Sequence, residues 1–265
     1  MRSVSCNLCG SNDYSPVVDI SGFTIVKCRQ CNLLFVNQRP EVEKASDYYT
    51  DVYYSYLNKS SDIGRTFYGE GSKKLFQEIL CICKKFIPEG RLLDVGCGYG
   101  FFLRLMKESG YSVCGVDPSE SACRFSNQEM DLKVTQGTLD SVSFQDNYFE
   151  IITMNNVLEH LDDPSFALRK AYSLLKPKGI LIIVVPNLNF GKPLLAMRPV
   201  LEMSPSKVRS FIDSVTAKLA LFHIPDHLYL FSPSTLSNML IKAGLTKPIL
   251  SNAPPILIYF RFNQI

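Results

Sequence analysis

The segment from Leu92 to Leu103, LLDVGCGYGFFL, places the strongest constraint on the fold of this chain. An apolar run ending at Val95 passes through the pattern D-x-G-x-G-x-G into residues with helical spacing. Alternate glycines let a backbone turn sharply and approach a ligand, and the following helix presents free N–H groups at its positive dipole end. The spacing differs from the dinucleotide fingerprint G-x-G-x-x-G, so we do not expect a pyrophosphate ligand.

Strand-like and helical segments alternate through the rest of the chain. The strand-like segments are 91–95, 112–116, 133–136, 149–154 and 179–185, and the helical ones are 72–86, 101–109, 120–128, 164–175 and 232–243. Residues 179–185 are apolar without alternation, which indicates burial on both faces. Residues 246–250 and 255–262 fit two antiparallel closing strands. The pattern predicts an α/β fold with a doubly wound, mainly parallel sheet.

An acidic residue, Asp117, ends the second predicted strand in the sequence GVDPS. A carboxylate at that place can accept hydrogen bonds from both hydroxyls of a ribose. Together with the glycine turn, it describes a nucleoside bound across the carboxyl ends of the strands.

Four segments in this order resemble class I S-adenosylmethionine-dependent methyltransferases: LLDVGCGYG, GVDPS, FEIITMNNVLEHLDDP and LLKPKGILIIVVPN. The resemblance covers about residues 68–262. It implies a Rossmann-like, seven-stranded methyltransferase sheet whose last strand is antiparallel, and an enzyme that uses S-adenosylmethionine.

The same resemblance implies which residues contact the cofactor. They lie at or just beyond the ends of predicted strands: Asp94, Gly96, Gly98, Asp117, Pro118, Thr138, Leu139 and Asn155. In the family, the first three surround the methionine part of the cofactor and the acid after the second strand holds the ribose. The following proline and the pair after the third strand line the adenine, and Asn155 approaches the sulfonium.

Four of the nine cysteines form two C-x2-C pairs near the N-terminus: Cys6, Cys9, Cys28 and Cys31. No secretory signal precedes them, so we expect a cytoplasmic protein, in which disulfides are rare. This spacing is that of a zinc ribbon with a closed, structural Zn²⁺ site; reduced or redox cysteines without metal are the alternative. The other five cysteines are expected to pack as small apolar side chains.

A length of 265 residues fits one large domain with a small module. We expect a zinc ribbon over 1–40, a tyrosine-rich connector over 41–67, and a methyltransferase domain over 68–265. An insertion at 187–226, with a helical piece at 206–221, interrupts that domain on the substrate side. The sequences CRQCNLLFVNQRP and DYYTDVYYSYL are similar to the start of a methyltransferase subgroup with an N-terminal zinc domain, often linked to sugar and polysaccharide modification.

Three histidines, His160, His223 and His227, are the candidates for a general base. The segment DHLYLFS resembles a stretch of zinc-containing sugar methyltransferases in which the histidine, here His227 beside Asp226, is the base. His160 follows the fourth predicted strand near the methyl end of the cofactor and is a second candidate. Ile224 stands where the carbon-methylating relatives often have a tyrosine, which weakens a carbon acceptor. A purely structural role for each histidine is the alternative.

The first hypothesis is therefore a methyltransferase acting on a small molecule, a nucleotide sugar or a polysaccharide precursor. Ribosomal RNA methyltransferases with a zinc site are the alternative, but a net charge of +3 without a basic run argues against a nucleic-acid partner. A non-catalytic, cofactor-binding scaffold is the second alternative. The longest apolar run, residues 180–186, is too short for a membrane span. The acceptor atom and the oligomeric state are left open.

Overall fold

The computed structural model describes residues 1–20, 22–39, 69–190, 227–245, 248–250 and 255–261. The expected connector at 41–67, the helical piece at 206–221, His223 and Asp226 lie outside the described residues. Of the insertion expected at 187–226, only its first residues, 187–190, are described.

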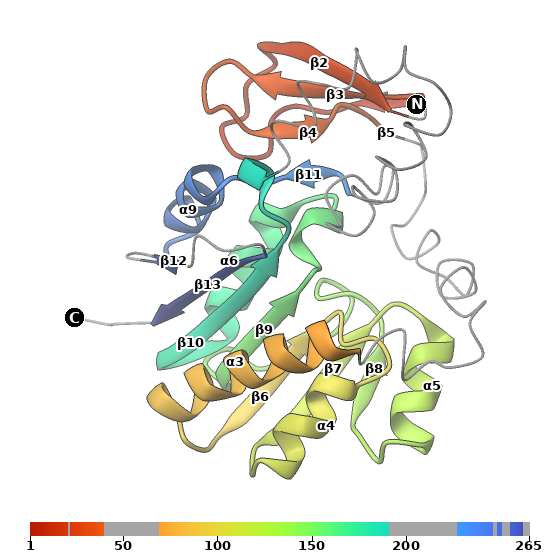
Figure 1. Cartoon of the computed structure of the whole chain (residues 1–265), viewed down its shortest axis with the longest axis vertical. Coiled ribbons are helices and arrows are strands. Elements are labelled where there is room, and N and C mark those ends of the chain that lie inside the picture. The colour runs from red at the N-terminus through yellow and green to blue at the C-terminus, as the bar shows by residue number, and fades with distance from the viewer. Residues whose placement is uncertain (21, 40–68, 191–226, 246–247, 251–254, 262–265) are drawn as a thin grey trace.

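A seven-stranded sheet forms the centre of the molecule, with the order β12-β13-β10-β9-β6-β7-β8 (Figure 1). Its strands are β6 (Arg91–Val95), β7 (Ser112–Asp117), β8 (Val134–Gln136), β9 (Phe149–Asn155), β10 (Leu175–Val185), β12 (Ile249–Leu250) and β13 (Ile256–Arg261). Strands β6 to β10 are parallel, and β13 is antiparallel to β10 and to β12. The predicted doubly wound methyltransferase sheet with an antiparallel last strand is confirmed.

Helices cover both faces of this sheet. One face carries α3 (Glu70–Phe86), α4 (Phe101–Glu108) and α5 (Glu120–Gln128), and the other carries α6 (Pro164–Leu174) and α9 (Pro233–Lys242). Alternate residues of β10 face the two layers of helices. Ile180 and Ile182 pack in the core beneath α3, α4 and α5, and Leu181 and Ile183 pack in the core beneath α6 and α9. Because both faces are buried, the strand is apolar at every one of these positions.

A second, smaller sheet lies at the N-terminal end of the molecule (Figure 1). Its order is β11-β4-β3-β2, built from β2 (Tyr14–Ile20), β3 (Phe23–Cys28), β4 (Leu34–Val36) and β11 (Tyr229–Leu230). A two-stranded ladder of β1 (Arg2–Ser3) and β5 (Gln38–Arg39) accompanies it. Strands β2 and β11 were not anticipated from the sequence.

The small sheet shares its cores with the large one. Phe35 of β4 is fully buried and contacts the rings of Tyr14 and Tyr229 at 5.9 and 6.5 Å between centroids. Leu188 and Leu230, which lie far from the N-terminal strands in the sequence, pack in the core of the small sheet. The N-terminal module is therefore docked through buried apolar surface, which excludes water from the junction.

Among the described residues, no helix combines the length and apolar character needed to cross a membrane.

Candidate functional site

The glycine loop follows β6, as the sequence predicts. Gly96 and Gly98 have φ angles of 69° and 52°, a conformation that side chains other than glycine rarely adopt. A Cβ atom on Gly96 would lie 2.4 Å from Cγ2 of Val157, so only glycine fits. Val157 precedes the short helix η2 (Leu158–His160), and this contact therefore places the segment after β9 against the glycine loop.

Two buried carboxyl groups flank this loop. Asp94 is 3% exposed and accepts a hydrogen bond of 2.6 Å from the Thr153 hydroxyl. Burial raises the pKa of Asp94 to about 7, against the lowering effect of that hydrogen bond. Asp117 accepts hydrogen bonds from the backbone N–H groups of Gly98 at 2.7 Å and Ser119 at 3.0 Å. The ribose candidate thus also ties the glycine loop to the N-terminus of α5, where Ser119 is the N-cap.

The remaining cofactor candidates lie along the same edge of the sheet. Asn155 is the last residue of β9, Pro118 directly follows β7, and Thr138 and Leu139 follow β8. Strands β8, β7, β6 and β9 are neighbours in this order and run parallel, so their carboxyl ends meet at one edge. The structure brings all eight candidates to that edge, where doubly wound sheets bind ligands.

His160 and His227, which are far apart in the sequence, lie face to edge at the same edge of the sheet. Their ring centroids are 4.7 Å apart with an interplanar angle of 74°. His160 ends η2, while His227 stands two residues before β11 and is 5% exposed. The proposed partner of His227, Asp226, lies outside the described residues.

A third side chain, Glu159, completes this cluster and was not anticipated from the sequence. One ligand atom from each of Glu159, His160 and His227 lies within 4.8 Å of the others. Glu159 is 1% exposed, and burial raises the pKa of its carboxyl group to about 8. A carboxyl group with such a pKa is largely protonated at neutral pH and can donate a hydrogen bond. The signal that could have identified it is the acid directly before His160.

The four N-terminal cysteines converge at the end of β3, with their sulfur atoms within 4.8 Å of one another. Cys6 and Cys31 are 3.4 Å apart between sulfur atoms, as are Cys9 and Cys28. Zn–S bonds of about 2.3 Å place the sulfurs of a tetrahedral site roughly 3.8 Å apart, so the four thiols fit a zinc ion after small shifts. The N-terminal cysteine cluster therefore fits a small zinc ribbon.

Each C-x2-C turn has the same backbone geometry. The amide of Gly10 donates to the carbonyl of Cys6 at 2.7 Å, and the amide of Asn32 donates to the carbonyl of Cys28 at 3.0 Å. Gly10 and Asn32 both have positive φ angles, of 81° and 63°. The repeated turn brings the two thiols of each pair to the same side of the chain.

The fold and the glycine–acid edge together define a class I S-adenosylmethionine-dependent methyltransferase. A family model described as "Methyltransferase domain" matches residues 68–248. The chain belongs to this family.

Ubiquinone biosynthesis O-methyltransferases are among the relatives in sequence. The protein from Pseudomonas entomophila is 29% identical over 130 residues, covering 46% of this chain and 56% of that one. The protein from Alkalilimnicola ehrlichii is 35% identical over 105 residues, covering 37% of this chain and 42% of that one. The chain thus spans about half the length of these relatives.

Solved structures support the fold. The 1,6-didemethyltoxoflavin-N1-methyltransferase of Burkholderia thailandensis has a TM-score of 0.55 at 15% identity, covering 89% of this chain and 98% of that one. A SAM-dependent methyltransferase from Methanosarcina mazei has a TM-score of 0.53 at 18% identity, covering 69% of this chain and 98% of that one. At these identities, the likeness shows the fold alone.

We predict that Asp117→Ala weakens S-adenosylmethionine binding at least tenfold, because it removes the predicted ribose acceptor and releases the amide of Gly98. Isothermal titration calorimetry measures this, with Asp131→Ala as control, because Asp131 is an exposed acid paired with Lys107. Unchanged affinity in Asp117→Ala would exclude the ribose role.

We also predict one zinc ion per chain in freshly purified, reduced protein, measured by atomic emission. Cys28→Ser should lower the zinc content and the urea midpoint, because metal binding contributes folding free energy in so small a module. Cys81→Ser is the control, since Cys81 is exposed and outside the cluster. Wild-type protein with almost no metal would contradict the zinc site.

Proposed function

We propose that this enzyme transfers the methyl group of S-adenosylmethionine to a hydroxyl group of a small molecule, specifically a nucleotide sugar or a precursor of a cell-surface polysaccharide. The observation that carries the proposal is the contact between the partly exposed His160 and the buried His227 at the edge that carries the glycine loop. The names of the O-methyltransferase relatives support an oxygen acceptor. The zinc-ribbon cysteines and the DHLYLFS segment support a sugar.

In this proposal, the residues of the sheet edge hold the cofactor. Asp94, Gly96 and Gly98 surround its methionine part, Asp117 binds the ribose, and Asn155 approaches the sulfonium. Pro118, Thr138 and Leu139 line the adenine. The zinc ribbon of residues 1–40 has a structural role. The connector at 41–67 and the insertion at 187–226 complete the acceptor pocket of the domain at 68–265.

Bound S-adenosylmethionine supplies a methyl group already activated on a sulfonium. The residues of the chain must then orient the acceptor in line with that methyl group and take up its proton. His227, tuned by Asp226, accepts the hydroxyl proton as the C–O bond forms and the C–S bond breaks, and His160 holds the ring of His227 from the side. Ile224 in place of the tyrosine of carbon-methylating relatives favours oxygen over carbon.

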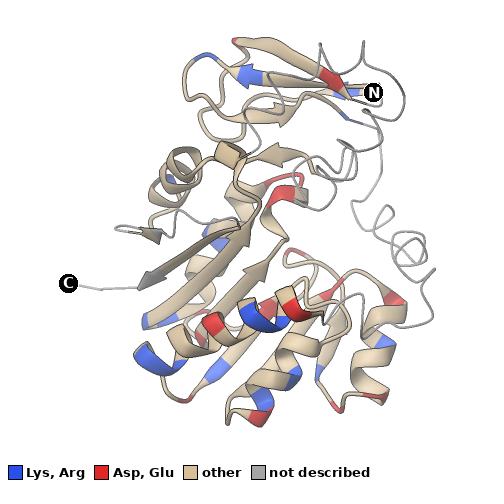
Figure 2. Cartoon of the chain, viewed as in Figure 1, with Lys and Arg blue, Asp and Glu red and all other residues tan. Residues whose placement is uncertain are grey.

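The two other hypotheses have less support. Figure 2 shows lysine and arginine mixed with aspartate and glutamate on α3, α4 and α5, and the net charge of the chain is only +3. A scaffold that only binds cofactor does not require two histidine rings in contact beside the cofactor edge. We therefore place RNA methylation and scaffolding behind methylation of a small molecule.

A screen of acceptors tests the proposed function. We predict that nucleotide sugars accept a labelled methyl group at their hydroxyls, with ubiquinone-type phenols and ribosomal RNA fragments tested in parallel. Product mass and fragmentation identify the methylated oxygen. Turnover of RNA or phenols alone would overturn the sugar assignment.

We further predict that His227→Ala leaves S-adenosylmethionine affinity unchanged and lowers kcat about 100-fold, because a positioned base contributes roughly 10²–10⁴-fold. His160→Ala should have a smaller effect. Normal turnover in His227→Ala would exclude the base. A second metal equivalent that disappears in His227→Ala would instead indicate a cation site, because a carboxylate with two imidazoles can bind divalent metals.

A further inference from the structure

The segment that carries His227 belongs to both parts of the molecule. The amide of Val36 in β4 donates to the carbonyl of Leu228 at 2.9 Å, and the amide of Leu228 donates to the carbonyl of Glu159 at 2.8 Å. A single residue thus bonds to the small sheet on one side and to η2 on the other. The backbone next to His227 therefore links the arrangement of the small sheet to that of η2.

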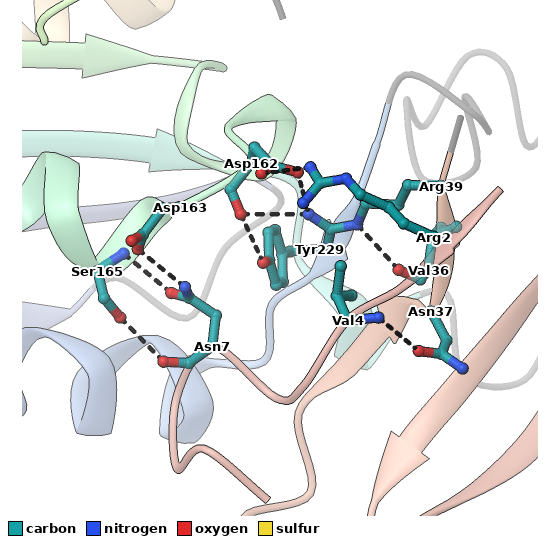
Figure 3. Close-up of polar contacts among 10 residues, drawn as sticks. All are labelled: Arg2, Val4, Asn7, Val36, Asn37, Arg39, Asp162, Asp163, Ser165 and Tyr229. Carbon is teal, nitrogen blue, oxygen red and sulfur yellow. Dashed lines mark hydrogen bonds and ion pairs between the residues drawn. The ribbon is translucent and has the colours of Figure 1, made fainter. Parts of the chain in front are cut away.

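Arg39, at the end of β5, fixes that arrangement (Figure 3). Its side chain is 3% exposed and donates to the carbonyl of Val36 at 3.1 Å, and to the carbonyl and carboxylate of Asp162 at 3.2 and 2.9 Å. The guanidinium also lies 4.8 Å from the centre of the Tyr229 ring. One side chain therefore contacts β4, β11 and the segment just after His160.

Asp162 receives further contacts that hold it in place. Arg2 forms an ion pair with its carboxylate at 2.6 Å, and the Tyr229 hydroxyl donates to its carbonyl at 3.0 Å. Burial alone would raise the pKa of Asp162, but hydrogen bonds from Arg2 and Arg39 bring that pKa below its usual range. The carboxylate is charged at neutral pH and remains an acceptor for both arginines.

The first C-x2-C turn makes a second, separate contact with the same region (Figure 3). Asn7, between Cys6 and Cys9, donates to the Asp163 carboxylate at 2.8 Å and accepts from the Ser165 amide at 2.9 Å. The Ser165 hydroxyl donates to the carbonyl of Asn7 at 3.1 Å. The N-terminus of α6 is thereby bound directly to the cysteine cluster.

We propose that the N-terminal module is a positioning part of the active site, in which Arg39, through Asp162 and Tyr229, and Asn7, through Asp163 and Ser165, hold His160 and His227 in contact. The inference rests on the proposed function, because it explains how the histidine pair is kept in place. It assigns Arg39 and Asn7 as positioning residues that touch neither substrate nor cofactor. The reaction then requires an intact ribbon, although the ribbon itself contributes no reacting group.

The test compares Arg39→Ala, the milder Asp162→Asn, and Arg29→Ala as matched control. Arg29 is another ribbon arginine in an ion pair with an aspartate, Asp13, but both side chains are more than half exposed. We expect all three variants to retain one zinc ion and S-adenosylmethionine affinity within twofold of wild type. Arg39→Ala should lower kcat at least tenfold, Asp162→Asn should lower it less, and Arg29→Ala should leave it unchanged.

Two readouts separate positioning from general destabilisation. In Arg39→Ala, the pH–rate profile should shift, because the environment of His227 changes, while the cofactor affinity does not. Arg39→Lys should recover little activity, since an ammonium cannot reproduce the planar fork that reaches Val36 and Asp162 together. Unchanged kcat and pH profile in both Arg39→Ala and Asp162→Asn would overturn the proposal, as would a fall in cofactor affinity that matches the fall in kcat.

A measurement without any acceptor distinguishes this inference from the proposed function. The chain has only three histidines, so ¹⁵N-labelled imidazoles can be assigned with a His223→Gln variant and titrated by NMR. We expect the His160 and His227 signals of Asp162→Asn to shift relative to wild type, and those of Arg29→Ala to remain. Wild-type protein that methylates no acceptor would refute the function, whereas unaltered signals in Asp162→Asn would refute the positioning.

Discussion

The pairing of β11 with β4 determines how the two sheets of this protein meet. β11 has only two residues, Tyr229 and Leu230, and both side chains are buried. Its backbone completes the edge of the small sheet, and its side chains enter cores that belong to both parts. Because backbone pairing fixes the register, and because Leu228, the residue before β11, is bonded to both Val36 and Glu159, the chain is held in place next to His227. The same short strand therefore contributes both to the docking of the N-terminal module and to the placement of the histidine site.

Buried acids show how the environment assigns different states to chemically similar groups at this edge. Burial raises the pKa of Asp94 to about 7 and that of Glu159 to about 8, because desolvation outweighs their hydrogen bonds. Asp162 is only half buried, and its two arginine partners lower its pKa despite that burial. An acid that supports the ribbon contact is thus kept charged, while an acid beside the histidines is kept largely neutral.

Local sequence patterns predicted the large sheet and its glycine turn well, because each strand–turn–helix unit contains its own signals. The DVGCGYG turn and the Ser119 N-cap of α5 are examples, and the ends of the α/β elements fell within a few residues of those expected. β11 could not be predicted, since a two-residue strand has no periodicity and its partner β4 lies in the N-terminal module. Glu159 and Arg39 were missed for the same reason: their burial arises only when distant segments meet.

Apolar and charged groups contribute differently to the contact between the N-terminal module and the rest of the protein. Phe35, Tyr229 and Leu230 bury apolar surface, which is favourable but hardly directional. A buried guanidinium adds little net stability, because its desolvation offsets much of the attraction to a carboxylate. Its hydrogen bonds are directional, however, and those of Arg39 reach Val36 and Asp162 at fixed angles. An apolar residue at this position could keep the module attached, but it could not define the rotation of the ribbon on which the separation of the two histidines depends.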